Sequence, residues 1–236
     1  MKRYKRESQS SYALGTTVCF ELLAQRKQQV RAVYVHPNIN ESDGYFKLLD
    51  LCEKYKIEVR KESKIFNVLS PKENCFVIGE FEKYPSELSP DRPHIALVSP
   101  SGSGNVGTIM RTMLGFGFKD LALVLPCADP FSPETVRSSM GAVFSLNVKE
   151  YRSFEEYVEE FKTHAPYPFM LTASKPVGEV NFLFPYTLIF GNEARGLEEK
   201  FAALGQSVII PCSRDVDSLN LSVAAAIAMY EAKKRT

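Results

Sequence analysis

Residues 218–231 read Ser-Leu-Asn-Leu-Ser-Val-Ala-Ala-Ala-Ile-Ala-Met-Tyr-Glu, and this stretch restricts the fold most strongly. Two hydroxyl side chains and an amide, Ser218, Asn220 and Ser222, stand at its start, where helices favour Ser and Asn as caps. Residues 223–230 are apolar on every face, which predicts a helix that is buried on all sides. A single Ser or Asn at this place is typical of a helix cap, but three such side chains within five residues favour a site.

A second informative stretch, residues 99–115, follows an apolar run at 95–98 and reads Ser-Pro-Ser-Gly-Ser-Gly-Asn-Val-Gly-Thr-Ile-Met-Arg-Thr-Met-Leu-Gly. Its apolar residues recur with helical spacing, which places Asn105 and Arg111 on the opposite, polar side of the expected helix. The glycines do not form the G-x-G-x-x-G fingerprint of dinucleotide-binding proteins, and no Gly-Lys-Ser/Thr follows as in a P-loop. An exposed Arg on a helix is ordinarily solvated, so this stretch alone decides no function.

The third stretch, residues 188–197, reads Leu-Ile-Phe-Gly-Asn-Glu-Ala-Arg-Gly-Leu and runs from an expected buried strand into two glycines. Ligands of open parallel sheets bind beyond the carboxyl ends of the strands, and glycine lets a ligand approach the backbone closely. Asn192, Glu193 and Arg195 lie between the two glycines, so they are candidates for a site. A Gly-containing turn before a short helix is the alternative interpretation of this stretch.

The order of the expected elements predicts an α/β protein. Helical patterns cover residues 12–28, 45–55, 65–69, 153–162 and 221–230, and runs of strand length lie at 30–35, 57–59, 75–78, 95–98, 121–125, 143–148, 169–172, 187–190 and 208–210. Apolar strands without polar alternation, separated by helices, indicate a parallel sheet covered on both faces. Three prolines between positions 84 and 93 mark a linker. We therefore expect a small domain over residues 1–88 and a larger one over residues 89–236.

The composition is that of an ordinary globular protein. Of the 236 residues, 44% are hydrophobic and 24% are charged, with a formal net charge of +1. No run of eighteen apolar residues and no apolar signal core are present, so we expect no membrane association and a cytoplasmic location. The five cysteines and three histidines are scattered, which argues against disulfides and against a metal site. Residues 1–84 carry 15 Lys and Arg against 11 Asp and Glu, a mild excess that is compatible with a phosphate-rich partner as well as with a solvated surface.

Three motifs together resemble those of a known family. They are N-x-G-x-x-x-R at 105–111, F-G-N-E-A-R-G-L at 190–197, and I-P at 210–211 followed by S-L-N-L-S-V-A-A-A at 218–226. In this order and at these spacings they resemble the signature motifs of the SpoU (TrmH) family of the SPOUT class, whose members are RNA ribose 2′-O-methyltransferases that use S-adenosylmethionine. Residues 136–144 resemble the segment between the first two motifs, and residues 8–84 resemble, more weakly, a ribosomal-protein-like RNA-binding domain.

The resemblance implies several features that periodicity does not show. The sheet of the larger domain would end in a C-terminal trefoil knot, although knots are rare in proteins. The protein would act as a homodimer, in which the Arg of the first motif reaches into the partner's site. The small N-terminal α/β domain would bind the RNA substrate.

The resemblance also assigns roles to residues of this chain. Gly191, Ile210 and Leu219 would hold S-adenosylmethionine, largely through backbone groups, and Thr172 and Ala173 would line the same pocket at the end of their strand. The family's catalytic residues correspond to Asn105, Arg111, Glu193, Ser218 and Asn220. Arg111 matches the residue proposed in the family as the base.

A guanidinium stays protonated in proteins, so a simple base role for Arg111 is difficult on physical grounds. The alternative is that Arg111 holds the adjacent phosphate and stabilises developing charge on the attacking oxygen. Asn105, Glu193, Ser218 and Asn220 would then orient Arg111 and the ribose.

Other functions stay open at this point. Ribosomal RNA is the expected substrate because of the N-terminal domain, and transfer RNA is the alternative. A non-catalytic RNA-binding protein that has retained the fold would have lost motif residues, and none is lost here. A nucleotide-dependent oxidoreductase is disfavoured because the dinucleotide fingerprint is missing.

Overall fold

The structure is a computed structural model that describes residues 3–70, 75–213 and 215–234. The chain forms two compact units. Of the described residues, unit 1 contains those up to Tyr84 together with Asp129–Ser145, and unit 2 contains Pro85–Ala128 and those from Leu146 onward. The expected division into 1–88 and 89–236 therefore differs in two ways: the first boundary lies after Tyr84, and a later segment joins unit 1.

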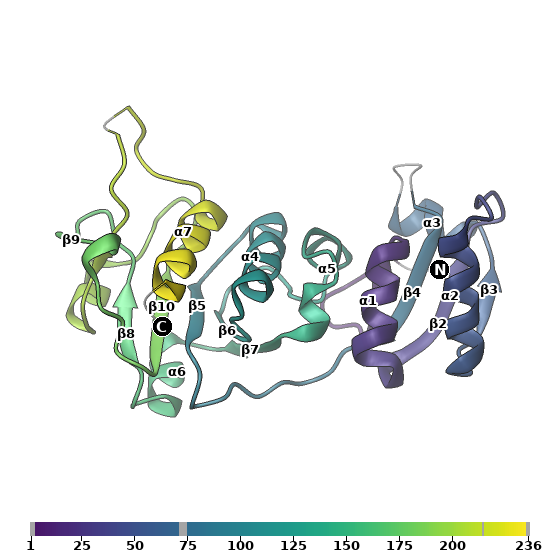
Figure 1. Ribbon diagram of the computed structural model, residues 1–236, viewed down its shortest axis with the longest axis horizontal. Coiled ribbons are helices and arrows are strands. Elements are labelled where there is room, and N and C mark those ends of the chain that lie inside the picture. Colours follow the sequence, from purple (N-terminus) through teal and green to yellow (C-terminus); the bar gives the residue numbers. More distant parts are fainter. Residues whose placement is uncertain (1–2, 71–74, 214, 235–236) are drawn as a thin grey trace. The chain divides into compact units, whose positions relative to one another are not determined.

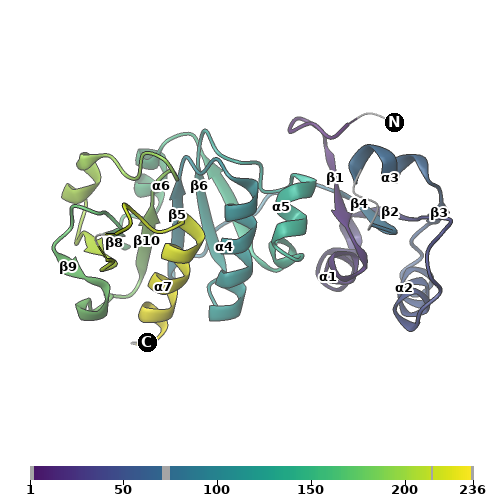
Figure 2. The same cartoon turned by 90° about the horizontal axis from the view of Figure 1, so that it is seen from above.

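Unit 1 is built on a four-stranded sheet with the order β1-β4-β2-β3. Its strands are β1 (Ser10–Leu14), β2 (Val30–Val35), β3 (Val59–Lys61) and β4 (Val77–Glu82). Its first helices are α1 (Thr16–Arg26), the 3-10 helix η1 (Lys27–Gln29), α2 (Asp43–Lys54) and α3 (Lys64–Leu69). Helices α1 and α2 lie on one face of the sheet and α3 lies on the other, as the two views agree (Figures 1 and 2).

The prediction of one helix over residues 12–28 was wrong at its start. Residues 10–14 form β1, which pairs with β4 in antiparallel fashion. Gly15 then turns the chain into α1 with a φ of 100°, a conformation that favours glycine. Both faces of β1 are covered, since Ala13 and Leu14 are both buried. The strand therefore lacks the polar alternation that would have separated it from the helix.

The segment 129–145 joins unit 1 because it packs on the first helix and first strand of that unit. It contains α5 (Pro133–Ser138), which contacts β1, and the 3-10 helix η2 (Ala142–Ser145). The Arg26 Nε donates a hydrogen bond of 3.0 Å to the Phe144 carbonyl. The Phe144 ring meets that of Phe81 edge-on at 5.1 Å. The strand predicted over residues 143–148 therefore begins later, at Asn147, because η2 occupies the residues up to Ser145.

Unit 2 has a five-stranded sheet with the order β7-β6-β5-β10-β8, and every pairing in it is parallel. The strands are β5 (His94–Val98), β6 (Asp120–Val124), β7 (Asn147–Tyr151), β8 (Ala165–Pro168) and β10 (Tyr186–Phe190). The helices are α4 (Ser103–Phe116), α6 (Phe154–Glu160), α7 (Leu221–Lys233) and the 3-10 helices η3 (Val177–Glu179) and η4 (Glu199–Ala203). The expected α/β architecture with a parallel sheet is confirmed.

The helices of unit 2 cover both faces of its sheet. Helices α4 and α7 lie side by side on one face, and α6 lies on the opposite face (Figures 1 and 2). Ser153 caps the start of α6, because its Oγ accepts from the Glu156 amide, and the Glu156 carboxylate accepts from the Arg152 amide. Within the described residues, none of the helices combines the length and the apolar content needed to span a bilayer.

A small second sheet lies beside β8. It pairs β9 (Lys175–Pro176) with β11 (Val208–Ile209) in parallel. The strand predicted over 169–172 was misplaced, because β8 ends at Pro168. After β8 the chain leaves the large sheet, and the Met170 amide donates to the Val208 carbonyl at 2.9 Å. Residues that follow β8 are thereby drawn towards the loop that leads into α7.

Helix α7 is not buried on all sides, contrary to the expectation. One side packs on α4 and β10, and Ala225, Ala228 and Met229 on that side are fully buried. On the other side Val223 is 46% exposed and Tyr230 is 49% exposed. The apolar residues of α7 therefore fall into two groups. One group packs in the core, and the other forms an apolar surface that the described residues leave uncovered.

Candidate functional site

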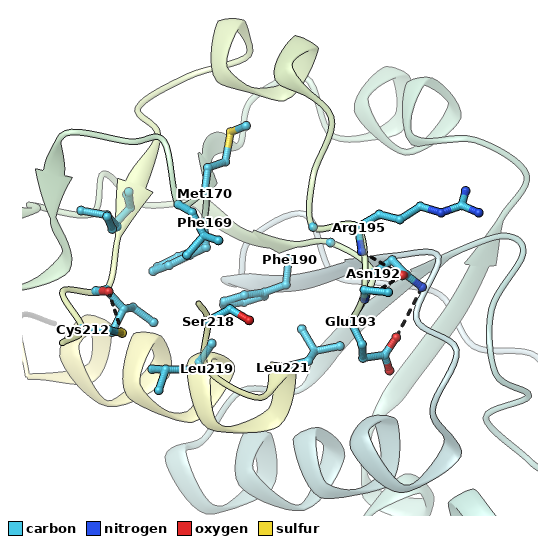
Figure 3. A pocket seen from close by; sticks show the side chains of 18 residues that line it. Phe169, Met170, Phe190, Asn192, Glu193, Arg195, Cys212, Ser218, Leu219 and Leu221 are labelled. Atoms are coloured by element: carbon cyan, nitrogen blue, oxygen red, sulfur yellow. Dashed lines mark hydrogen bonds between the residues drawn. The ribbon is translucent and has the colours of Figure 1, made fainter. Parts of the chain in front are cut away.

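A cavity of about 210 Å³ lies at the carboxyl end of β10 in unit 2. Three segments of the chain line it: residues 169–171 after β8, residues 190–196 at and after β10, and residues from 208 to 224 that include the start of α7. Figure 3 shows the side chains of these segments around the cavity. The second and third motifs of the sequence therefore meet at one place.

Five of the predicted site residues line this cavity. They are Gly191, Glu193, Ile210, Ser218 and Leu219. Thr172 and Ala173 are not among the residues that line it. The reason is the early end of β8, which brings Phe169, Met170 and Leu171 to the cavity and leaves Thr172 in the following turn.

Two glycines make the loop after β10 unusually tight. A Cβ atom on Gly191 would lie 2.1 Å from the Gly196 carbonyl carbon and oxygen, so only glycine fits there. Gly196 has a φ of 68°, in the left-handed region that favours glycine. Asn192 and Gly196 exchange backbone hydrogen bonds of 3.2 and 2.8 Å, and the Asn192 Oδ1 accepts from the Ala194 amide at 3.0 Å. The loop is thus a closed turn with a fixed shape.

The Glu193 carboxylate is held at the start of α4. Its Oε2 accepts from the amide and hydroxyl of Ser101, both at 2.9 Å, and its Oε1 accepts from the Gly102 amide at 2.9 Å and from Asn105 Nδ2 at 3.1 Å. Burial acts to raise the pKa of Glu193, but these hydrogen bonds outweigh burial and lower the pKa to about 2. Glu193 is therefore a fixed anion that satisfies backbone donors at the start of the helix.

A chain of side-chain hydrogen bonds continues from Glu193 across the site. Asn105 donates to Glu193, and the Asn105 Oδ1 accepts from Asn220 Nδ2 at 3.1 Å. The Asn220 Oδ1 in turn accepts from the Ser222 amide at 2.9 Å and from its hydroxyl at 2.7 Å. The cap predicted for the last helix is thus formed, and its amide group also reaches the first motif. All three motifs are joined by this network.

Arg111 lies apart from the other predicted site residues. It is exposed on α4 and does not line the cavity. Among the described residues, no hydrogen bond or ion pair holds its side chain. Arg111 stands six positions after Asn105, which corresponds to roughly 9 Å along a helix. Within a single chain, the structure brings together Asn105, Glu193, Ser218 and Asn220 but not Arg111.

Two aromatic residues of the site had no predicted role, and the partner of the candidate residue Asn192 was not predicted. The rings of Phe169 and Phe190 stack in the cavity wall at 4.7 Å with an interplanar angle of 18°. Asn192 Nδ2 donates to the Ser99 carbonyl at 2.8 Å and thereby ties the loop after β10 to the end of β5. Phe190 is the last residue of β10 and Asn192 follows this strand, as the sequence indicated, whereas Phe169 was predicted to begin a strand and lies just after β8.

The cavity combines an apolar wall with backbone groups and a few polar side chains, which suits an organic ligand. No group of three or more His, Cys, Asp or Glu side chains that could hold a metal ion occurs within residues 3–70, 75–213 and 215–234.

Comparison with known proteins gives relatives that match more than half of this chain. The 23S rRNA (uridine(2479)-2'-O)-methyltransferase of Streptomyces viridochromogenes is 32% identical over 144 residues, which are 58% of this chain and 50% of that protein. The 23S rRNA (guanosine(2553)-2'-O)-methyltransferase RlmP of Bacillus subtilis is 31% identical over 150 residues, 61% of this chain and 59% of that protein. The chain spans about half the length of the curated relatives it matches.

Solved structures show the same fold over nearly the whole chain. The AdoMet-bound rRNA methyltransferase of Sinorhizobium meliloti aligns with a TM-score of 0.82 over 97% of this chain and 88% of that one, at 24% identity. At this identity the likeness concerns the fold. The sequence profile of the SpoU rRNA Methylase family matches residues 92–230, which is more than half of the chain. The resemblance in the motifs is therefore confirmed, and the chain belongs to the SpoU rRNA Methylase family.

Proposed function

We propose that the protein is an S-adenosylmethionine-dependent RNA methyltransferase that acts on a ribose 2′-hydroxyl, with ribosomal RNA as the substrate. One observation carries the proposal: the network Glu193–Asn105–Asn220 joins all three motifs beside a single cavity. Relatives that match more than half of this chain are named as 2'-O-methyltransferases of 23S rRNA. The cytoplasm is the compartment in which we expect such a protein to meet its substrate.

The cavity fits the proposed cofactor. An adenine ring is flat and apolar on its faces, and the stacked Phe169 and Phe190 belong to an apolar wall that would suit it. Gly191, Ile210 and Leu219 line the cavity, and their backbone groups would supply the hydrogen bonds to the edge of the adenine ring. When bound, the cofactor supplies a methyl group made electrophilic by its sulfonium.

The residues around the cavity would prepare the acceptor. The ribose 2′-oxygen would form its bond to the methyl carbon as the carbon–sulfur bond of the sulfonium breaks, which would leave a neutral thioether. Its proton would pass to solvent water, and the oxygen would carry developing negative charge during that step. Asn105 and Asn220 are held by each other and by Glu193, so their amides are fixed dipoles that can orient the ribose. Fixed orientation of two reactants is itself a large part of catalysis.

We propose further that the protein is a homodimer in which Arg111 serves the partner's cavity. Arg111 is exposed on α4 and lies outside the cavity of its own chain. Helix α7 packs beside α4 and carries the exposed Val223 and Tyr230. An apolar face next to an unpaired cation suits a second copy of the same chain. Arg111 would then hold a phosphate and stabilise charge on the attacking oxygen, because its guanidinium stays protonated.

Two structural parts of the proposal concern the ends of the chain. We propose that the segment from β10 to α7 forms a trefoil knot, which is supported by the fold shared with SpoU structures and by a cavity lined by loops on both sides of β11. We also propose that unit 1 binds the RNA. Its exposed aromatic side chains Phe46 and Phe76 could stack on unpaired bases.

Methyl transfer to natural RNA tests the proposed function. Total RNA from cells that lack the gene contains the unmodified substrate, so it is incubated with purified protein and S-adenosylmethionine labelled in the methyl group. We expect label in the ribosomal RNA fraction, at a ribose that resists alkaline cleavage after the reaction. Label in transfer RNA alone would show that transfer RNA is the substrate in place of ribosomal RNA. RNA binding without any methyl transfer would favour the non-catalytic alternative.

A further inference from the structure

A second cavity, of about 690 Å³, lies next to the first one in unit 2. It lies at the carboxyl ends of β5 and β6 and is closed on one side by residues 192–198 after β10. The sheet order reverses between β5 and β10, because β6 follows on one side of β5 and β10 lies on the other. Such switch points are where open α/β sheets bind their ligands.

The two cavities share a wall. Asn192, Ala194, Arg195 and Gly196 line both of them. This wall is the closed turn described above, so it holds the two cavities at a fixed separation. A group transfer requires donor and acceptor to sit side by side in a defined geometry. The second cavity is therefore placed where an acceptor would have to lie.

The backbone is strained where β5 enters this cavity. Ser99 has a φ of 53°, which is rare for a residue other than glycine. It is held there by its own amide, which donates to the Val124 carbonyl at 3.0 Å, and by Asn192, which donates to its carbonyl at 2.8 Å. Strain of this kind persists only where the surroundings enforce it, and it occurs frequently at binding sites.

The lining suits a nucleotide. Pro100 is buried and Pro126 is exposed, and both lack an amide hydrogen, so they give the cavity apolar faces. The Ser101 hydroxyl, which donates to Glu193, can still accept a hydrogen bond. Arg195 is exposed, and among the described residues no hydrogen bond or ion pair occupies its guanidinium. In Figure 3 it extends away from Phe190 and Leu219.

We infer that the second cavity binds the nucleotide whose ribose is methylated, unstacked from its neighbours, with Arg195 on a flanking phosphate. The inference rests on the proposed function and names the residues that would hold its acceptor. An Arg guanidinium matches the geometry of a phosphate, and RNA-binding proteins commonly read bases that are splayed out of a helix. The base would lie between the proline faces, and the ribose would point to the shared wall.

Two variants test this inference from different directions. Arg195→Ala removes the phosphate contact, and Ala128→Leu fills the second cavity from a residue that does not line the first one. Lys162→Ala is the matched control, since Lys162 is an exposed cation that pairs with Glu159 and lines neither cavity. Melting temperatures first establish that all variants are folded. Labelled methyl transfer to total RNA from cells lacking the gene is then measured against RNA concentration, and S-adenosylmethionine binding is measured by calorimetry.

We expect Arg195→Ala to raise the RNA concentration for half-maximal rate about tenfold, in line with the loss of one charged hydrogen-bonded contact. The slope of log affinity against log salt should fall by about 0.7, as for one phosphate on a single strand. Ala128→Leu should lower methyl transfer at least as strongly. Cofactor affinity should stay within about twofold in both variants, because Ala128 does not line the first cavity and the Arg195 side chain extends away from Phe190 and Leu219.

The outcomes separate this inference from the proposed function. If the wild-type protein transfers no methyl group to this RNA, the proposed function fails and the inference fails with it. If the wild type transfers methyl groups and both variants do so as the control does, the inference alone is wrong. A loss of cofactor affinity in Arg195→Ala with unchanged RNA dependence would also overturn it, because Arg195 would then serve the first cavity.

Discussion

The side-chain amide of Asn220 donates a hydrogen bond of 3.1 Å to the Oδ1 of Asn105, which lies 115 positions earlier in the chain. The Nδ2 of Asn105 in turn donates a hydrogen bond of 3.1 Å to the Oε1 of Glu193. One amide side chain therefore joins the start of α4 to the start of α7. Because amides both donate and accept, two Asn side chains can orient each other as well as a ribose hydroxyl.

The first prediction is that Asn105 and Asn220 act as a unit. Asn105→Ala and Asn220→Ala should each lower methyl transfer about tenfold to a hundredfold, because each leaves the other amide without its partner. The double variant should lose much less than the product of the two single losses, since residues in one network are not additive. Single-turnover rates at saturating cofactor measure the three variants. Additive losses would show that the hydrogen bond between the two residues is not used in the reaction.

The second prediction concerns Glu193 and pH. Its folded pKa is lowered to about 2, so the stability it contributes is fully present above the unfolded value and is lost as pH falls through about 2. Glu193→Gln places an amide nitrogen opposite backbone donors of Ser101 or Gly102, which should lower the melting temperature by roughly 2–4 °C near neutral pH. The difference between wild type and variant should be constant above pH 5 and shrink as the pH falls below about 4.

Scanning calorimetry across this pH range measures the difference. Glu198→Gln is a suitable control, because Glu198 is exposed and pairs only with Lys200 among the described residues. It should leave the melting temperature almost unchanged at every pH. A Glu193→Gln difference that persists unchanged at the acid end would contradict an ionised clamp.

The third prediction concerns a buried histidine in unit 2. His94 Nδ1 contacts the Tyr157 hydroxyl at 2.9 Å, and that hydroxyl contacts Thr187 Oγ1 at 2.6 Å, which His164 reaches at 3.1 Å. Burial lowers the pKa of His94 to about 4, against a smaller raising effect of its hydrogen bond to the Ser89 carbonyl. Burial likewise lowers the pKa of His164.

A histidine that is kept neutral in the fold costs stability when it must be charged. The contribution of His94 is fully present above its unfolded pKa of about 6.5 and is lost as pH falls towards about 4. We expect the melting temperature of the wild type to fall between pH 6.5 and pH 4, and to fall less steeply in His94→Gln, which will be less stable at neutral pH. Equal slopes for wild type and His94→Gln would contradict the prediction.

The motifs predicted which residues lie together better than the periodicity predicted the elements around them. Glu193, Asn105 and Asn220 were expected to act together, and they contact one another because parallel strands bring their carboxyl ends to one edge. The place of Thr172 was misjudged because β8 ends at Pro168, and an apolar run does not tell where a strand leaves its sheet. The covered strand β1 looked helical because both of its faces are buried.

Long-range packing was the part that the sequence could not predict. Residues 129–145 lie between two strands of unit 2 in the chain and yet belong to unit 1. Arg26 contacts this segment through the backbone carbonyl of Phe144. Every residue has such a carbonyl group, so the sequence gives no sign of this contact. Helix α7 was expected to be wholly buried because its residues are apolar on every face. The sequence does not distinguish an apolar residue that packs in the core from one that would contact a partner. The exposed Val223 and Tyr230 became visible only with the fold.

The last prediction concerns Arg111, which lies outside the cavity of its own chain. Arg111→Ala should lower single-turnover methyl transfer about a hundredfold to a thousandfold, by analogy with removing one donor that stabilises charge in a transition state. Arg111→Lys should be nearly as inactive, because an ammonium cannot reproduce the planar fork. Cofactor binding should barely change in either variant, since Gly191, Ile210 and Leu219 are untouched. Near-normal rates in both variants would show that Arg111 is an ordinary solvated surface residue.

Mixing two inactive variants tests whether Arg111 acts across a dimer. In a mixed dimer of Arg111→Ala with Asn220→Ala chains, one of the two sites combines an intact Asn220 from one chain with an intact Arg111 from the other. Random exchange of subunits in a twofold dimer should therefore restore about a quarter of the wild-type rate. If Arg111 served its own chain, every site in the mixture would lack one of the two residues, and no activity would return. Val223→Lys places a charge on the apolar face of α7 and should abolish the recovery by keeping the chains apart, whereas Lys162→Ala in both chains should leave it intact.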